Sequence, residues 1–140
     1  MQSKEDENIV FIRLFTDENL NIELKKACKK HDVKTAVILS GVGQLKESEI
    51  GYFKTKGDYL PEKINKTCEI LMLTGNICKK EDDYILHSHI ILGDKNKNAI
   101  GGHFINGTIS ITAEIVIIKT NINIKRKYDE ETGLQALFLD

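Results

Sequence analysis

Residues 84–104 read YILHSHIILGDKNKNAIGGHF, and this stretch decides the fold of the chain. Two apolar runs flank a polar segment that begins at Gly93, which is the pattern of a β-hairpin. With Asn96 at the centre of the turn, His89 lies directly opposite His103, with facing Cβ atoms about 5 Å apart. Side chains alternate between the two faces of a strand, so His87 shares the face of His89. The stretch therefore predicts a hairpin on which three imidazoles converge.

Convergence of these imidazoles depends on strand register. A slip of one residue would send His103 to the other face, and a bulge at Gly101 and Gly102 could correct such a slip. Three neutral imidazoles with an open fourth position are the ligands of catalytic-type zinc, and they also suit nickel, copper or iron. The alternative is that the histidines only pack and form hydrogen bonds on a polar sheet surface or at a subunit interface. We name His87, His89 and His103 as candidate ligands of zinc or another divalent transition metal.

A helix is predicted after residue 19, because Thr16, Asp17, Glu18 and Asn19 supply an N-cap and first-turn acids. The residues at helical spacing that follow are Leu20, Leu24, Ala27, Cys28 and His31. The opposite face carries Lys25, Lys26, Lys29 and Lys30. These lysines favour a solvated face over a nucleic-acid contact, and cations near the C-terminal end suit the helix dipole.

The remaining patterns are mostly those of strands. Candidate strands are residues 9–15, 33–39, 45–54, 66–73, 84–92, 99–104 and 108–118. Glycines at 41 and 43 predict a turn or a close backbone approach, Pro61 a loop, and Gly75-Asn76 a turn. One helix followed by strands with short connections indicates an α+β fold, with a largely antiparallel sheet and one main covering helix. Such a sheet leaves a face or an edge exposed, which favours an oligomer.

Length and composition indicate the class of protein. A chain of 140 residues fits a single domain, here 1–140, that buries a core without a structural metal. The 20 basic and 21 acidic residues give a net charge of −1, which supplies no overall attraction to nucleic acid or to anionic lipid.

Cysteine usage and hydropathy indicate the compartment. Cys28, Cys68 and Cys78 are odd in number and widely spaced, which favours reduced core thiols over disulfides or metal ligands. The first eight residues lack the apolar run of a signal peptide, and no apolar run approaches 20 residues. We therefore expect a cytoplasmic protein with no membrane partner.

Several segments together resemble one known family. They are residues 37–43 (VILSGVG), 69–75 (EILMLTG), 86–89 (LHSH), 101–104 (GGHF), 112–117 (TAEIVI) and 129–134 (DEETGL). In this order they resemble the PPC domain family, the plants and prokaryotes conserved domain, in its stand-alone prokaryotic type. Phe104 replaces a more usual Leu. The resemblance implies an α+β homotrimer in which the three histidines form a zinc-type site in some prokaryotic members.

The same resemblance implies DNA binding only by analogy. In plants this domain accompanies AT-hooks in nuclear DNA-binding proteins, but an AT-hook needs a basic R-G-R-P core, and the sole proline here is Pro61. The nearest basic cluster, Lys125-Arg126-Lys127, favours a solvated strand end or tail over a DNA contact. We expect weak DNA binding from this chain alone.

Glu114 lies in an apolar run, so it is either a structural hydrogen-bond partner or a group that acts near the histidines. Three functions follow. The first is a metal-binding homotrimeric PPC-type module with an interaction or regulatory role. The second is a DNA-binding, transcription-associated protein, and the third is a zinc-dependent hydrolase with Glu114 as base. No nucleophile-elbow, phosphate-loop or paired-carboxylate pattern is present, so nucleophilic and phosphoryl-transfer chemistry have no support in the sequence. Whether the protein is an enzyme is left open.

Overall fold

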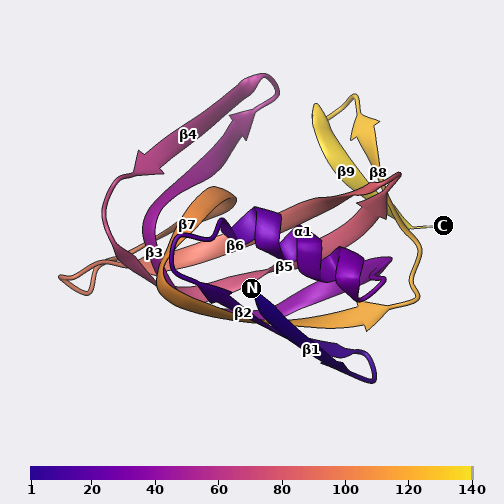
Figure 1. Ribbon diagram of the computed structural model, residues 1–140. Coiled ribbons are helices and arrows are strands. Elements are labelled where there is room, and N and C mark those ends of the chain that lie inside the picture. Colours follow the sequence, from indigo (N-terminus) through magenta and orange to yellow (C-terminus); the bar gives the residue numbers. More distant parts are fainter. Residues whose placement is uncertain (140) are drawn as a thin grey trace.

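The computed structural model describes residues 1–139 (Figure 1). Its elements are β1 (Gln2–Asp6), β2 (Ile9–Phe15), α1 (Leu20–Lys30), β3 (Thr35–Thr55), β4 (Asp58–Ile64), β5 (Cys68–Lys80), β6 (Asp83–Gly93), β7 (Ala99–Thr120), β8 (Ile124–Asp129) and β9 (Leu134–Leu139). The chain is thus mostly strand. The expected largely antiparallel sheet is confirmed, although the helix is a minor part of the fold.

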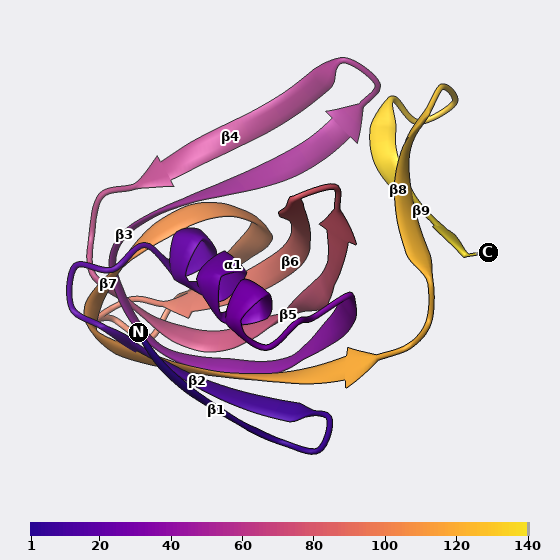
Figure 2. The ribbon, with the colours of Figure 1, turned by 45° about the vertical axis from the view of Figure 1, so that its right-hand side comes forward.

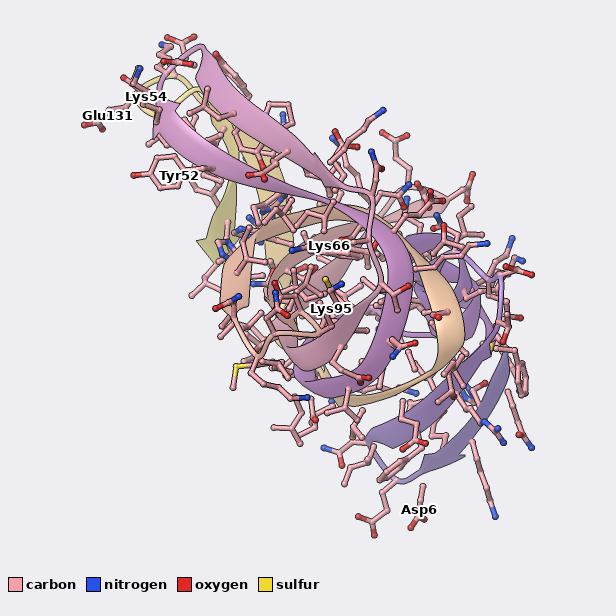
Figure 3. All side chains as sticks on the ribbon, turned by 90° about the vertical axis from the view of Figure 1, so that its left-hand side faces the viewer. Asp6, Tyr52, Lys54, Lys66, Lys95 and Glu131 are labelled. Atoms are coloured by element: carbon pink, nitrogen blue, oxygen red, sulfur yellow. The ribbon has the colours of Figure 1, made fainter. Side chains whose placement is uncertain are left out.

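The main sheet closes on itself. Its strand order is β1-β2-β7-β6-β5-β3-β4, all neighbours are antiparallel, and β3 also pairs with β7. Strands β3, β5, β6 and β7 therefore form a ring, which Figure 3 shows nearly end-on. Closure leaves fewer open edges, because the long strands β3 and β7 are paired on both sides over part of their length.

The helix covers the concave side of this sheet (Figure 2). It begins as predicted, because the Asn19 side chain accepts a hydrogen bond from the backbone N–H of Ile22. The four apolar residues predicted to face the sheet are all buried: Leu20, Leu24, Ala27 and Cys28. The ring of the fifth predicted residue, His31, instead contacts Glu5 and Ser3 on β1. Most of the helical face therefore belongs to the hydrophobic core.

Two hairpins project from the same side of the ring and position the candidate site. One is formed by the end of β3 with β4, and the other by β8 with β9 (Figure 1). Figure 3 shows Tyr52 and Lys54 on the first hairpin and Glu131 on the second, all on this side. Lys56 of the first hairpin donates a hydrogen bond to the backbone carbonyl of Glu130, so the two hairpins touch.

Several predicted interruptions of strands are wrong, including the gap between residues 104 and 108, which lies within β7. Residues 40–43 do not turn the chain, because β3 runs through them, and residues 33–39 and 45–54 belong to one long strand region. Gly43 has φ +143° and would place a Cβ atom 2.3 Å from the Thr112 carbonyl oxygen, so the close backbone approach predicted as the alternative to a turn is confirmed at this position. Gly75 likewise lies within β5 rather than in a turn.

Pro61 lies in β4 rather than in a loop. It is tolerated there because β4 is an edge strand, and the open side of an edge strand has no neighbour with which a backbone N–H could form a hydrogen bond. Strands β1, β4, β8 and β9 were not predicted. The expectation that the cysteines are core residues is confirmed, since Cys28, Cys68 and Cys78 are all buried. None of the helical segments between residues 1 and 139 has the length and apolar character needed to cross a bilayer.

Candidate metal centre

The three histidines converge as the sequence predicts. His89 pairs directly with His103, and Gly93 pairs with Ala99, which places Asn96 at the centre of the turn. The ring centroids lie 5.3 Å apart for His87 and His103, and 5.5 Å apart for the other two pairs. One ring nitrogen from each histidine lies within 4.8 Å of the others. Ser88, between the two histidines of β6, is buried on the opposite face.

Glycines at 101 and 102 permit this arrangement, but not by a bulge. The β6–β7 register is regular from Ala99 to His103. A Cβ atom on Gly102 would lie 2.8 Å from the carbonyl oxygen of Gly51, and one on Gly101 would lie 2.8 Å from that of Ile90. The irregularity lies farther along, where β7 shifts against β3 between Phe104 and Asn106. The two glycines therefore let the neighbouring backbones approach closely around His103.

The three histidines line a cavity of about 730 Å³ between the two projecting hairpins. Its walls are Gly51, Tyr52, Phe53, Tyr59, Ile85, Leu86, Gly102, Arg126, Leu134 and Gln135, besides the three histidines. The Tyr59 ring meets His103 edge-on, with centroids 6.2 Å apart and planes at 83°. An apolar cavity with a few converging polar groups is the usual form of a small-molecule site.

Arg126 is the charged residue of this cavity that the sequence did not reveal. Its Nη2 donates to Asn76 Oδ1 at 2.6 Å and lies 3.1 Å from His87 Nδ1, and its Nη1 donates to the Gln135 carbonyl at 3.0 Å. The predicted solvated strand end is therefore wrong for Arg126. The adjacent Lys127 is exposed, and its side chain lies over the Phe138 ring. The only sequence signal is alternation along β8, which puts Arg126 on the face opposite to its two neighbours.

The environment favours the neutral forms of His87 and His103. Burial lowers the pKa of His87, and the positive charge of Arg126 and the neighbouring His103 and His89 lower it further. Burial and then His89 lower the pKa of His103. Neutral imidazole is the form that binds metals. Tetrahedral bonds of about 2.0–2.1 Å would set the nitrogens about 3.3 Å apart. The ring nitrogens lie within 4.8 Å of one another, so the donor set fits a transition metal if the rings move closer together.

Glu114 does not lie at this site. It is exposed, pairs with Arg13 on β2 and Val42 on β3, and lines a separate groove beside β1. On β7 it is eleven residues from His103, about 36 Å along the strand at about 3.3 Å per residue. Among residues 1–139, no acidic side chain lines the histidine cavity. Of the two roles left open for Glu114, the one as a base near the histidines is therefore wrong.

Solved structures with this fold come from several prokaryotes. A candidate DNA-binding protein from Bacteroides thetaiotaomicron matches 99% of this chain and 96% of its own, with a TM-score of 0.91 and 24% identity. A metal-containing protein from Archaeoglobus fulgidus matches 96% and 95%, with a TM-score of 0.84 and 24% identity. A plant- and prokaryote-conserved protein from Pyrococcus horikoshii matches 96% and 93%, with a TM-score of 0.81 and 26% identity.

One curated relative is also similar. The chain is 29% identical over 130 residues to the bifunctional protein GlmU of Synechococcus sp.. The aligned segment covers 91% of this chain but only a fifth of that protein's length. The model of the Plants and Prokaryotes Conserved domain matches residues 1–121. The histidine motifs and the closed antiparallel sheet lie within the matched range, whereas β8, β9 and Arg126 lie beyond it. By this match the chain belongs to the Plants and Prokaryotes Conserved domain family.

Proposed function

We propose that this protein is a metal-binding homotrimeric module with an interaction or regulatory role in the cytoplasm. The observation that carries the proposal is the convergence of His87, His89 and His103 at the floor of an open, mainly apolar cavity. The buried free cysteines support a reducing compartment.

The metal part of the proposal rests on donor chemistry. Three imidazoles with an open fourth position suit zinc or another divalent transition metal, and the Archaeoglobus fulgidus structure is that of a metal-containing protein. A bound metal would supply a Lewis-acidic position that faces the cavity. His87, His89 and His103 would hold it, and the surrounding apolar side chains would limit the access of water.

The homotrimer rests on the family resemblance and on exposed apolar side chains of the sheet. On β5 and β6, Met72 pairs with Ile91, and both are exposed, as is Leu71. On β7, Ile111 is 66% exposed. Exposed apolar side chains of this number are typical of a surface that another chain covers.

Metal analysis of the protein purified without a histidine tag tests the proposal. We expect about one zinc or other transition-metal ion per chain, and loss of that ion in the separate variants His87→Ala, His89→Ala and His103→Ala. His31→Asn is the matched control, because His31 is the fourth histidine and contacts Glu5 and Ser3 instead. Unchanged metal content in all three cluster variants would overturn the proposal.

DNA binding is a second candidate, because the similar protein from Bacteroides thetaiotaomicron is named as a candidate DNA-binding protein. The balanced charge of this chain gives that role little electrostatic support. A zinc-dependent hydrolase is the third candidate. Its support is the open metal position alone, since no described acidic side chain lines the cavity to act as a base.

A further inference from the structure

We infer that the cavity above the three histidines binds a small carboxylate with an apolar body, and that Arg126 holds the carboxylate group. The inference rests on the proposed function in that it gives the metal site a ligand. Its own support is the charge and the lining of the cavity, together with the contacts of Arg126.

The cavity carries positive charge with no described negative partner. Arg126 contributes a permanent cation, and each of its hydrogen-bond acceptors is neutral: Asn76 Oδ1, the Gln135 carbonyl and His87 Nδ1. The Nε atom of Arg126 is hidden from solvent and has no hydrogen-bond partner among residues 1–139. A half-buried cation without a counter-charge is unfavourable, and a carboxylate matches a guanidinium with two parallel hydrogen bonds. This end of the cavity is therefore complementary to an anion.

The rest of the cavity is complementary to a ligand whose body, apart from the carboxylate, is apolar. A volume of about 730 Å³ is suited to a small molecule. Phe53 and Tyr59 from the first hairpin, Ile85 from β6 and Leu134 from the second hairpin supply aromatic and aliphatic walls. A phosphorylated sugar would leave its hydroxyl groups without partners against these walls. An aromatic or branched aliphatic monocarboxylate matches both ends of the cavity.

The Arg126 contact also couples this ligand to the metal. Arg126 only donates, so the Nδ1 atom that it faces is an acceptor, and the neutral His87 ring then carries its proton on Nε2. A metal at Nδ1 would compete for the same lone pair, and a metal at Nε2 would need the proton on Nδ1. The hydrogen bond and a metal bond to His87 are therefore mutually exclusive. A metal bound to His87 would release the Nη2 hydrogen that faces Nδ1, and a carboxylate could accept it, so each ligand would tighten the binding of the other.

Calorimetric titration with phenylacetate, hydrocinnamate and isovalerate tests the inference, on both EDTA-treated and zinc-loaded protein. We expect saturable binding of at least one of these carboxylates, tighter in the zinc-loaded form. Phenylacetamide, which has nearly the same shape but no charge, binds at least tenfold more weakly to the unaltered protein. Arg126→Gln weakens carboxylate binding at least tenfold. Lys127→Gln leaves it unchanged, because the adjacent Lys127 lies over Phe138 instead.

The outcomes separate this inference from the metal site itself. If zinc does not bind but a carboxylate binds through Arg126, the proposed metal function fails and the inference stands. If zinc binds through the histidines and none of the three carboxylates binds either form, the inference is overturned. Equal affinity for phenylacetate and phenylacetamide also overturns it, with no dependence on how a variant folds. Tighter binding of inorganic phosphate would refute the choice of a carboxylate.

Discussion

His89 lies directly opposite His103, and the Gly102 backbone beside this pair lies against the Gly51 carbonyl of β3. The histidine cluster therefore depends on contacts on both sides of β7. Its imidazoles keep their spacing only while β6, β7 and β3 stay in register, because a slip of one residue would reverse the face of His103.

Replacement of Gly102 by valine tests this dependence. A Cβ atom at this position would lie 2.8 Å from the Gly51 carbonyl oxygen, so β7 and β3 must separate. We expect a loss of about 1–3 kcal/mol in the free energy of unfolding and weaker zinc binding. Chemical denaturation and zinc titration measure the two effects. Lys95→Ala, in the turn of the same hairpin, is the control and should change neither quantity.

The hairpin was predictable because its signals are local. The alternation around His87 and His89 and the polar turn centred on Asn96 fix the pairing within one short segment. Gly43 and Gly75 illustrate the opposite case, since a glycine looks the same in sequence whether it turns the chain or admits a neighbouring backbone. A Cβ atom on Gly75 would lie 2.1 Å from the carbonyl oxygen of His87 on the neighbouring strand β6, and the sequence pattern around Gly75 does not distinguish this close approach from a turn.

The role of Arg126 was not predictable for a related reason. The Lys125-Arg126-Lys127 cluster reads as solvated, and only the packing of the β8–β9 hairpin beside β5 brings its middle residue to Asn76 and His87. Glu114 shows the opposite error, because the sequence indicated a buried residue and the structure exposes it. Its apolar neighbours indicated burial near a functional site, but the face it occupies turns to solvent because the core lies on the other side of β7.

Leu24 anchors the helix to the core, and its truncation should be costly. It is 1% exposed, and Leu24→Ala removes most of a fully buried side chain. We expect a loss of about 2–5 kcal/mol in the free energy of unfolding. Ile22→Ala on the same helix is the control, since Ile22 is 53% exposed and should change stability by less than about 0.5 kcal/mol. Equal effects of the two substitutions would contradict this placement of the helix.

Acidification should destabilise the metal-free protein. The pKa values of His87 and His103 are lowered in the folded state, so the unfolded chain binds more protons near and below its histidine pKa of about 6.5. Stability is therefore present above this pH and is lost as the pH falls toward the lowered pKa values. Urea midpoints measured from pH 7.5 to 5 should fall, and His87→Gln should reduce the dependence. A flat profile in the parent protein would contradict the assigned environment.

A charge on the exposed apolar surface should dissociate the proposed trimer. Met72 is 52% exposed in the single chain and lies beside Ile91, so Met72→Glu would place a carboxylate in the proposed interface. Light scattering at micromolar concentration should give three chain masses for the parent and a lower mass for the variant. Lys63→Glu on the edge strand β4 is the charge-changing control. A monomeric parent protein would refute the trimer outright.

DNA binding should be weak and without sequence preference. Several lysines already have acidic partners, including Lys25 with Asp83 and Lys46 with Asp17, and Arg126 turns into the cavity. A few phosphate contacts give dissociation constants of about 10⁻⁴–10⁻⁶ M at physiological salt, and the affinity should fall steeply as salt rises. A mobility-shift assay over a salt series, with random duplex as competitor, measures both properties. A nanomolar constant at about 0.15 M salt with preference for one sequence would place DNA binding first among the candidate functions.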